Sequence, residues 1–115
     1  MAAENQDFTL YQGEDEQVDF YVTDSDGSPK NLTGASIEWG MWLSGTRLLT
    51  KTTGSGASLV NGLGTNDIVR IAIAKADSIS LQPGAYYHEC RIVLSGSEQV
   101  IAVGHVLLKL SMTKD

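Results

Sequence analysis

Hydrophobic and polar residues alternate along most of the chain with the two-residue period of β-strands. The clearest case is the segment in which Val18, Phe20 and Val22 alternate with Asp19 and Tyr21. Successive side chains of a strand point to opposite faces, so this pattern predicts one buried face and one outward face. Similar segments recur along the sequence, at residues 8–11, 37–43, 47–51, 59–60, 69–73, 86–94 and 99–110.

Turn residues separate these segments. Ser44-Gly45 predicts a tight turn, and Ser95-Gly96-Ser97 predicts a hairpin between the last two strands. Residues 74–79 are the one place where we expect a helical turn. Because no long segment has helical periodicity, the pattern predicts an all-β fold, an antiparallel immunoglobulin-like β-sandwich of about seven to eight strands. The expected core consists of Phe20, Val22, Ile37, Trp39, Ile71, Ile73, Tyr86 and Ile92.

The length of 115 residues predicts one domain. We expect residues 8–115 to form it, after a polar and flexible N-terminal arm at residues 1–7. The net charge of −6 disfavours binding to nucleic acid. No signal peptide or membrane segment is expected, since the start is polar and the longest apolar stretch is shorter than a membrane span. A single cysteine, Cys90, fits synthesis in a reducing cytoplasm.

The sequence contains no recognisable catalytic set. His88 and His105 lie in predicted strands, and Cys90 is interpreted as a small buried hydrophobic residue. The segment 24–27 resembles the start of a calcium loop but lacks the remaining ligands, so a β-turn is expected there. The glycines at 54–56 and 62–64 lack the lysine and helix of a phosphate-binding loop. We therefore expect no enzyme activity, no cofactor and no metal site.

Large aromatic residues are expected on the outside of the sheets. If Phe20, Trp39 and Tyr86 face inward, alternation turns other rings outward, where large exposed rings favour a binding surface. The last strand is apolar on both faces, which also indicates a partner. A bulge at Gly104 or cover by loops would explain that strand without a partner, and both explanations stay open. The candidate interface is Tyr21, Trp42, Tyr87, Val103 and Leu107.

Three segments in series resemble the N-terminal domain of tailed-phage baseplate upper proteins. They are Leu10-Tyr11-Gln12-Gly13-Glu14-Asp15, then the ten residues from Asp26 to Ala35, then Leu81-Gln82-Pro83-Gly84-Ala85-Tyr86. The resemblance extends over nearly the whole chain. It implies an immunoglobulin-like sandwich that attaches a component to a phage particle through protein contacts, usually within a symmetric oligomer, with no enzyme activity and no cofactor.

This resemblance sets the expected role. Relatives usually continue into a coiled or receptor-binding region, whereas this sequence ends soon after the predicted sandwich. We therefore expect an adaptor, a baseplate or tail component, or a head-decoration (cement) protein. The expected partners are other virion proteins and further copies of the chain, in a virion made in bacterial cytoplasm. Antibody-type domains carry a tyrosine two residues before a cysteine, whereas His88 stands two residues before Cys90 here. An antibody-type domain is therefore disfavoured.

A carbohydrate-binding module for adhesion to the host surface is the alternative. Tyr21, Trp42 and Tyr87 would then form a stacking platform for a surface glycan, and the glycine-rich loops would shape its rim. A small enzyme would need a deep pocket holding His88 or His105 beside a carboxylate.

Overall fold

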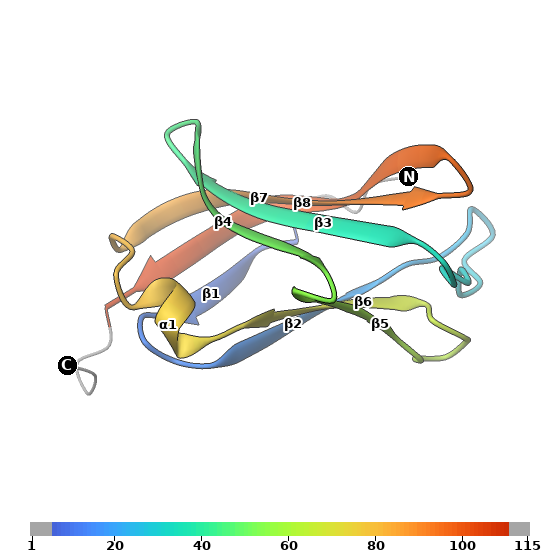
Figure 1. The fold of residues 1–115 in the computed structure, drawn as a ribbon, viewed down its shortest axis with the longest axis horizontal. Helices are drawn as coiled ribbons and strands as arrows, with labels where there is room; N and C mark the ends of the chain where they lie inside the picture. Colours follow the sequence, from blue (N-terminus) through green and yellow to red (C-terminus); the bar gives the residue numbers. More distant parts are fainter. Residues whose placement is uncertain (1–5, 111–115) are drawn as a thin grey trace.

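The computed structural model describes residues 6–110 and contains eight strands and one short helix (Figure 1). The all-β prediction is confirmed, and each predicted segment forms a strand or the expected helical turn. The elements are β1 (Phe8–Tyr11), β2 (Glu16–Tyr21), β3 (Ser36–Leu43), β4 (Thr46–Thr53), β5 (Gly56–Val60), β6 (Ile68–Ile73), α1 (Lys75–Ser78), β7 (Gly84–Leu94) and β8 (Ser97–Lys109).

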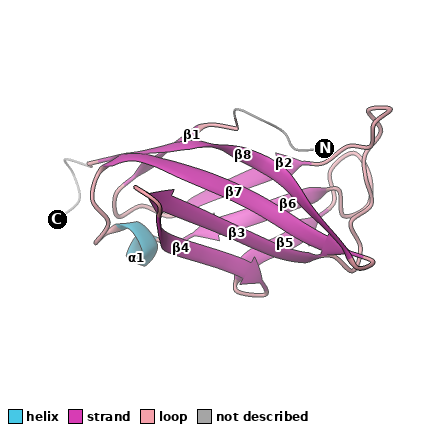
Figure 2. Ribbon diagram, turned by 90° about the horizontal axis from the view of Figure 1, so that it is seen from above, coloured by secondary structure: helices cyan, strands magenta, loops and turns pink. Residues whose placement is uncertain are grey.

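The strands form two layers that face each other across the core. One layer holds β3, β4, β7 and β8 together with β1, and the other holds β2, β5 and β6 (Figures 1 and 2). Backbone pairing runs in the order β1-β8-β7-β3-β4-β5-β6-β2. Most neighbours are antiparallel, but β1 pairs with β8 in parallel and β4 pairs with β5 in parallel.

The expectation of a sandwich with two separate antiparallel sheets needs correction. Thr52 and Thr53 of β4 pair with Gly56 and Ala57 of β5, so the two layers belong to one continuous, curled ladder. A tight loop joins the two parallel strands there, and in it Gly54 and Gly56 adopt φ angles of 79° and 96°. These values lie in the left-handed region, which glycine enters without steric cost.

The core lies between the two layers and contains most of the residues predicted for it. Seven of the eight expected residues are buried, and Val22 is half-buried and packs against them. Trp39 and Tyr86 are the largest side chains with essentially no exposure. Additional apolar side chains come from β1, β3, β8 and the segment before β3, and they include Leu10, Leu32, Met41, Val106 and Leu108.

β8 contains a bulge, but not at Gly104. The register with β7 shifts between the pairs Cys90–Ala102 and Arg91–Val100, which leaves Ile101 as the extra, buried residue. Gly104 pairs regularly with His88 and faces inward. A Cβ atom at Gly104 would lie 2.7 Å from the backbone carbon of Gln6. The N-terminal segment crosses β8 at this point and leaves no room for a side chain, so a glycine is needed at position 104.

The start of the described chain is attached to β8. Gln6 donates its backbone N–H to the carbonyl oxygen of Val103 at 3.0 Å. Asp7 accepts the backbone N–H of His105 at 2.8 Å. Residues 1–5 of the expected arm, and residues 111–115 of the expected domain, lie outside the described residues. The flexibility of the arm stays a prediction.

Candidate functional site: the outward sheet face

Three aromatic side chains form a row across the outer surface of β3, β7 and β8, here called the outward sheet face. Trp42 is paired with Tyr87, and Tyr87 is paired with His105, so the three side chains lie on the same face of the sheet. The ring centroids of Trp42 and Tyr87 are 5.8 Å apart, and those of Tyr87 and His105 are 6.4 Å apart. The register therefore produces a continuous aromatic row.

Trp42 lies down on the sheet instead of projecting from it. A Cβ atom at Gly40 would come within 2.7 Å of Cη2 of the Trp42 indole, so the ring covers this glycine. The guanidinium carbon of Arg47 is 4.7 Å from the ring centroid, a cation–π arrangement. Arg47 also pairs with Glu38 at 3.1 Å. These contacts hold the indole in a defined position on the outward sheet face.

The polar groups beside the aromatic row are paired with one another. Glu89 accepts a hydrogen bond from the Tyr87 hydroxyl at 2.9 Å and binds Arg91 at 2.8 Å. The hydrogen bond from Arg91 lowers the pKa of Glu89 below its usual value. Partial burial, followed by the bond to Glu89, raises the pKa of Tyr87. Glu89 is therefore an ionised hydrogen-bond acceptor and not a proton donor at neutral pH.

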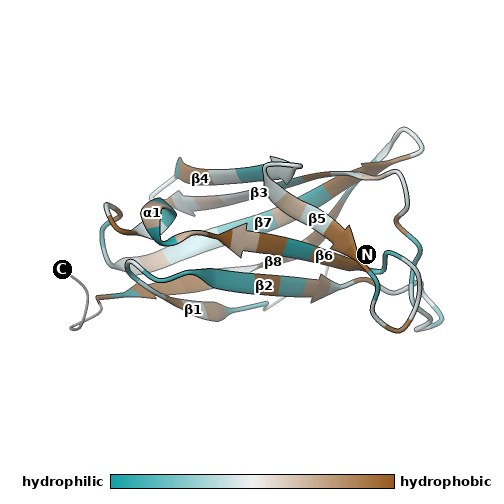
Figure 3. Cartoon of the chain, turned by 60° about the horizontal axis from the view of Figure 1, so that its bottom comes forward, coloured by the Kyte–Doolittle hydropathy of each residue, from teal (hydrophilic) through white to brown (hydrophobic). Residues whose placement is uncertain are grey.

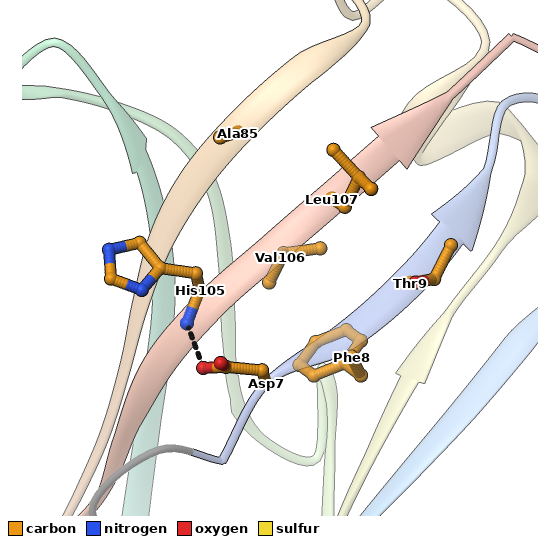
Figure 4. Close-up of a pocket in the computed structure, with 7 residues that line it drawn as sticks. All are labelled: Asp7, Phe8, Thr9, Ala85, His105, Val106 and Leu107. Atoms are coloured by element: carbon orange, nitrogen blue, oxygen red, sulfur yellow. Dashed lines mark hydrogen bonds between the residues drawn. The ribbon is translucent and has the colours of Figure 1, made fainter.

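Among the shallow hollows on this face, two adjoin each other. The larger, of about 460 Å³, opens between Trp42 and Tyr87 and includes the small residues Gly45 and Ala85. The smaller, of about 240 Å³, continues from Ala85 towards β1, and Figure 4 shows Leu107 and Thr9 along it. Both hollows are lined by Ala85 and His105, so they adjoin each other. The result is an open groove with aromatic, aliphatic and polar walls.

The structure brings four of the five candidate interface residues onto one face. Trp42, Tyr87, Val103 and Leu107 all belong to the outward sheet face, where Leu107 is 44% exposed. Tyr21 is 64% exposed but lies on β2, in the other layer. His105 was not predicted for this face, although its position midway between Val103 and Leu107 was a usable signal. Glu89, two residues after Tyr87, could also be placed on this face by alternation, whereas placing Arg47 beside Trp42 required the strand pairing, which the sequence does not give.

His88 and Cys90 lie in the interior. His88 is fully buried, accepts the indole N–H of Trp39 on Nδ1 at 3.2 Å, and contacts the carbonyl oxygen of Gln6 through Nε2 at 2.5 Å. Burial lowers the pKa of His88 and raises that of Cys90 to about 12. The interpretation of Cys90 as a buried hydrophobic residue is confirmed, whereas His88 is more deeply buried than the half-buried position expected for it.

A tyrosine corner precedes His88. The Tyr86 hydroxyl donates to the carbonyl oxygen of Gln82 at 2.6 Å, as the corner tyrosine does in immunoglobulin domains. Two residues later, where antibody domains have a cysteine, this chain has His88, which stacks on Phe20 with ring centroids 5.6 Å apart. The sequence pattern does not reveal this corner, because the cysteine that follows the corner tyrosine by two residues in antibody domains is replaced by His88 here.

The calcium-like segment is a β-turn, as predicted. Gly27 donates its N–H to the carbonyl oxygen of Asp24 at 2.9 Å and has a φ of 87°. Asp26 accepts hydrogen bonds from both the hydroxyl and the backbone N–H of Ser28, and these bonds lower the pKa of Asp26.

Within residues 6–110, no three His, Cys, Asp or Glu side chains gather as metal ligands would. No helix in this described part is long and apolar enough to span a membrane.

Solved structures with the same fold include a phage protein and an immune receptor. The N-terminal domain of phage TP901-1 ORF48 is similar with a TM-score of 0.58 and 11% identity, over 93% of this chain and 89% of that chain. A marsupial T cell receptor is similar with a TM-score of 0.52 and 12% identity, over 96% of this chain and 53% of that chain. No protein-family model and no curated protein sequence matches. At these identities the similarities show the fold, which is all-β and immunoglobulin-like.

Proposed function

We propose that this chain is a non-enzymatic structural component of a phage virion, which docks onto other virion proteins through the outward sheet face. The observation that carries the proposal is the surface aromatic row of half-buried Trp42 and exposed Tyr87 and His105 beside an open groove. Its fold, shared with the N-terminal domain of phage TP901-1 ORF48, supports the phage assignment. The role is that of an adaptor, a baseplate or tail component, or a head-decoration protein.

The chemistry of this face suits protein contacts better than catalysis. Interface centres are enriched in tryptophan, tyrosine and arginine, and Trp42, Tyr87 and Arg47 stand together here. The acid at the groove, Glu89, is already engaged by Tyr87 and Arg91. A catalytic carboxylate would need a free side towards a substrate and a nucleophile or base within reach. The aromatic row and the groove instead provide a surface that a partner protein can contact.

The presence of the chain in particles tests this proposal. Phage particles would be induced from the host whose genome encodes the chain, banded in a density gradient, and analysed by quantitative mass spectrometry. We expect the chain to co-purify with the main structural proteins at a fixed ratio across the band. Its confinement to the soluble fraction of the lysate, with none in the banded particles, would reject a virion role.

Carbohydrate binding is the second candidate, because two rings and polar groups border the larger hollow. Tyr87, Glu89 and His105 could supply stacking and hydrogen bonds to a sugar. The rings of Trp42 and Tyr87 are tilted by 48°, however, and Tyr21 lies on the other layer, so the expected three-ring platform is not formed. A glycan array discriminates between the two functions. Binding that requires Trp42 would favour the carbohydrate function, and an empty array favours protein docking.

A further inference from the structure

The larger hollow on the outward sheet face combines two aromatic walls with one carboxylate. Trp42 and Tyr87 are the walls, and Glu89 lines the hollow beside them. Gly45 and Ala85 leave the space between these groups open, because neither has a side chain larger than a methyl group. The residues that line this hollow, all within the described part of the chain, include no lysine and no arginine. The hollow is therefore aromatic and carries one anionic group.

The carboxylate of Glu89 is fixed in position and can still accept hydrogen bonds. Its Oε1 accepts the hydroxyl of Tyr87 at 2.9 Å, and its Oε2 accepts a hydrogen bond from Arg91 at 2.8 Å. An ionised carboxylate has about four acceptor positions, so these two bonds leave room for a further donor. Because Tyr87 is itself a wall of the hollow, its bond to Oε1 places that oxygen beside the ring. A donor in the hollow can therefore contact both the ring and the carboxylate.

The ion pairs around the hollow leave an excess of negative charge. Arg91 is shared by Glu89 and Glu98, at 2.8 Å and 3.2 Å, and Arg47 pairs with Glu38 at 3.1 Å. Three carboxylates thus accompany two guanidinium groups, which leaves one negative charge in this network. The net charge of the whole chain, −6, has the same sign. A partner that places a positive charge at the hollow is electrostatically complementary to it.

The same face already contains one guanidinium group bound by a ring and a carboxylate. The guanidinium carbon of Arg47 lies 4.7 Å from the ring centroid of Trp42, and Arg47 pairs with Glu38. The hollow presents a second such combination, the ring of Tyr87 beside Glu89. A planar guanidinium group suits it, since arginine stacks on aromatic faces and donates to carboxylates from the same fork.

We propose that the hollow between Trp42, Tyr87 and Glu89 binds an arginine side chain of the partner protein. The guanidinium group stacks in the aromatic hollow and donates to Glu89, while Gly45 and Ala85 leave room for the aliphatic part of the side chain. The inference rests on the docking role proposed above for the outward sheet face, and it adds the chemistry of the partner's contact residue. A neutral sugar or an apolar side chain would use the rings but not the charge of Glu89.

Two small probes test the site by NMR with the chain alone. N-acetyl-arginine amide carries its only charge on the guanidinium group, and N-acetyl-citrulline amide is its neutral counterpart. Each would be titrated up to about 100 mM at constant ionic strength, to detect weak binding. We expect the arginine probe to shift the Trp42 indole N–H and the Ala85 amide along one saturating curve, and the citrulline probe to shift neither. Two internal references should not move: the Trp39 indole, bonded to His88 in the core, and Tyr21, exposed on β2 at the front of Figure 3.

The variants Glu89→Gln and Glu98→Gln are a matched pair for this titration. Each removes one carboxylate bonded to Arg91 and leaves the other, but only Glu89 lines the hollow. Glu89→Gln should weaken binding of the arginine probe at least about threefold, and Glu98→Gln clearly less. The dispersion of the spectra establishes that both variants are folded.

Three results would overturn the inference: no shift with the arginine probe, equal binding of the citrulline probe, or binding that Glu89→Gln leaves unchanged. If the arginine probe fails but the chain is found in phage particles, the inference fails while the proposed function stands. If the probe binds as expected but the chain is absent from particles, the virion role is rejected while the arginine site stands.

Discussion

Trp39 donates its indole N–H to Nδ1 of His88 across 3.2 Å, and both side chains are fully buried between the two layers. This bond assigns the proton of the neutral imidazole to Nε2, which faces the carbonyl oxygen of Gln6. His88 also stacks on Phe20 of the other layer. One histidine thus connects β2, β3, β7 and the N-terminal segment in a domain that has no disulfide.

Trp39→Ala should destabilise the fold by about 3–5 kcal/mol, since it removes a buried aromatic ring and leaves His88 without its donor. Urea unfolding followed by circular dichroism measures this loss. Trp42→Ala is the matched control, because Trp42 is only half-buried on the outward sheet face, and it should cost clearly less. Equal losses for the two variants would contradict the assignment of Trp39 to the core.

Stability should fall as the pH decreases through the range in which the unfolded chain protonates His88. Burial lowers the pKa of His88 in the folded state, so below about pH 6.5 the unfolded state binds the proton first and is favoured. Asp7 opposes this shift and His105 adds to it. We expect a lower urea midpoint at about pH 5.5 than at about pH 7.5.

The variants His88→Gln and His105→Gln separate the two histidines in this experiment. His88→Gln should reduce the difference between the urea midpoints at the two pH values, although this variant should be less stable than the wild type at both. His105→Gln should keep most of the wild-type difference, since His105 is exposed. A wild-type midpoint that does not change over this range would mean that His88 is not the buried neutral group described.

Cys90 should be inert towards thiol reagents in the folded protein. Its side chain is fully buried, and burial raises its pKa to about 12, so almost no thiolate exists at neutral pH. Labelling with a disulfide reagent should occur only after urea is added, at a rate that follows unfolding. Fast labelling of the native chain would contradict the burial of the Cys90 thiol.

Gly104→Ala should displace the N-terminal segment from β8. The added methyl group would lie 2.7 Å from backbone atoms of Gln6, which cannot move aside without losing the bond to Val103. Hydrogen exchange should show lost protection at Gln6 and little change in β3. Val103→Ala is the control, because the bond to Gln6 uses only its backbone. Retained protection of Gln6 in Gly104→Ala would contradict this packing.

The strands, their order along the chain and most of the core could be predicted, because alternation reports burial directly. The pairing between strands that are distant in the sequence could not be predicted, and therefore the residues that share the outward sheet face could not all be identified. Tyr21 was grouped with Trp42 and Tyr87 by exposure alone, although β2 lies on the other layer. A bulge at Gly104 was one of the explanations left open for the last strand, because an inward glycine gives the same pattern, whereas the contact of Gly104 with Gln6 is visible only in three dimensions.

Incorporation of Trp42→Ala into particles tests the central claim most directly. The wild-type chain, Trp42→Ala and the control Ile79→Ala would each be supplied from a plasmid during growth of a phage that lacks its own copy. Banded particles would then be analysed by quantitative mass spectrometry. We predict normal amounts of the wild-type chain and of Ile79→Ala, and at least about tenfold less of the folded Trp42→Ala chain, the loss expected for a central interface tryptophan. Equal incorporation of all three would contradict docking through the outward sheet face.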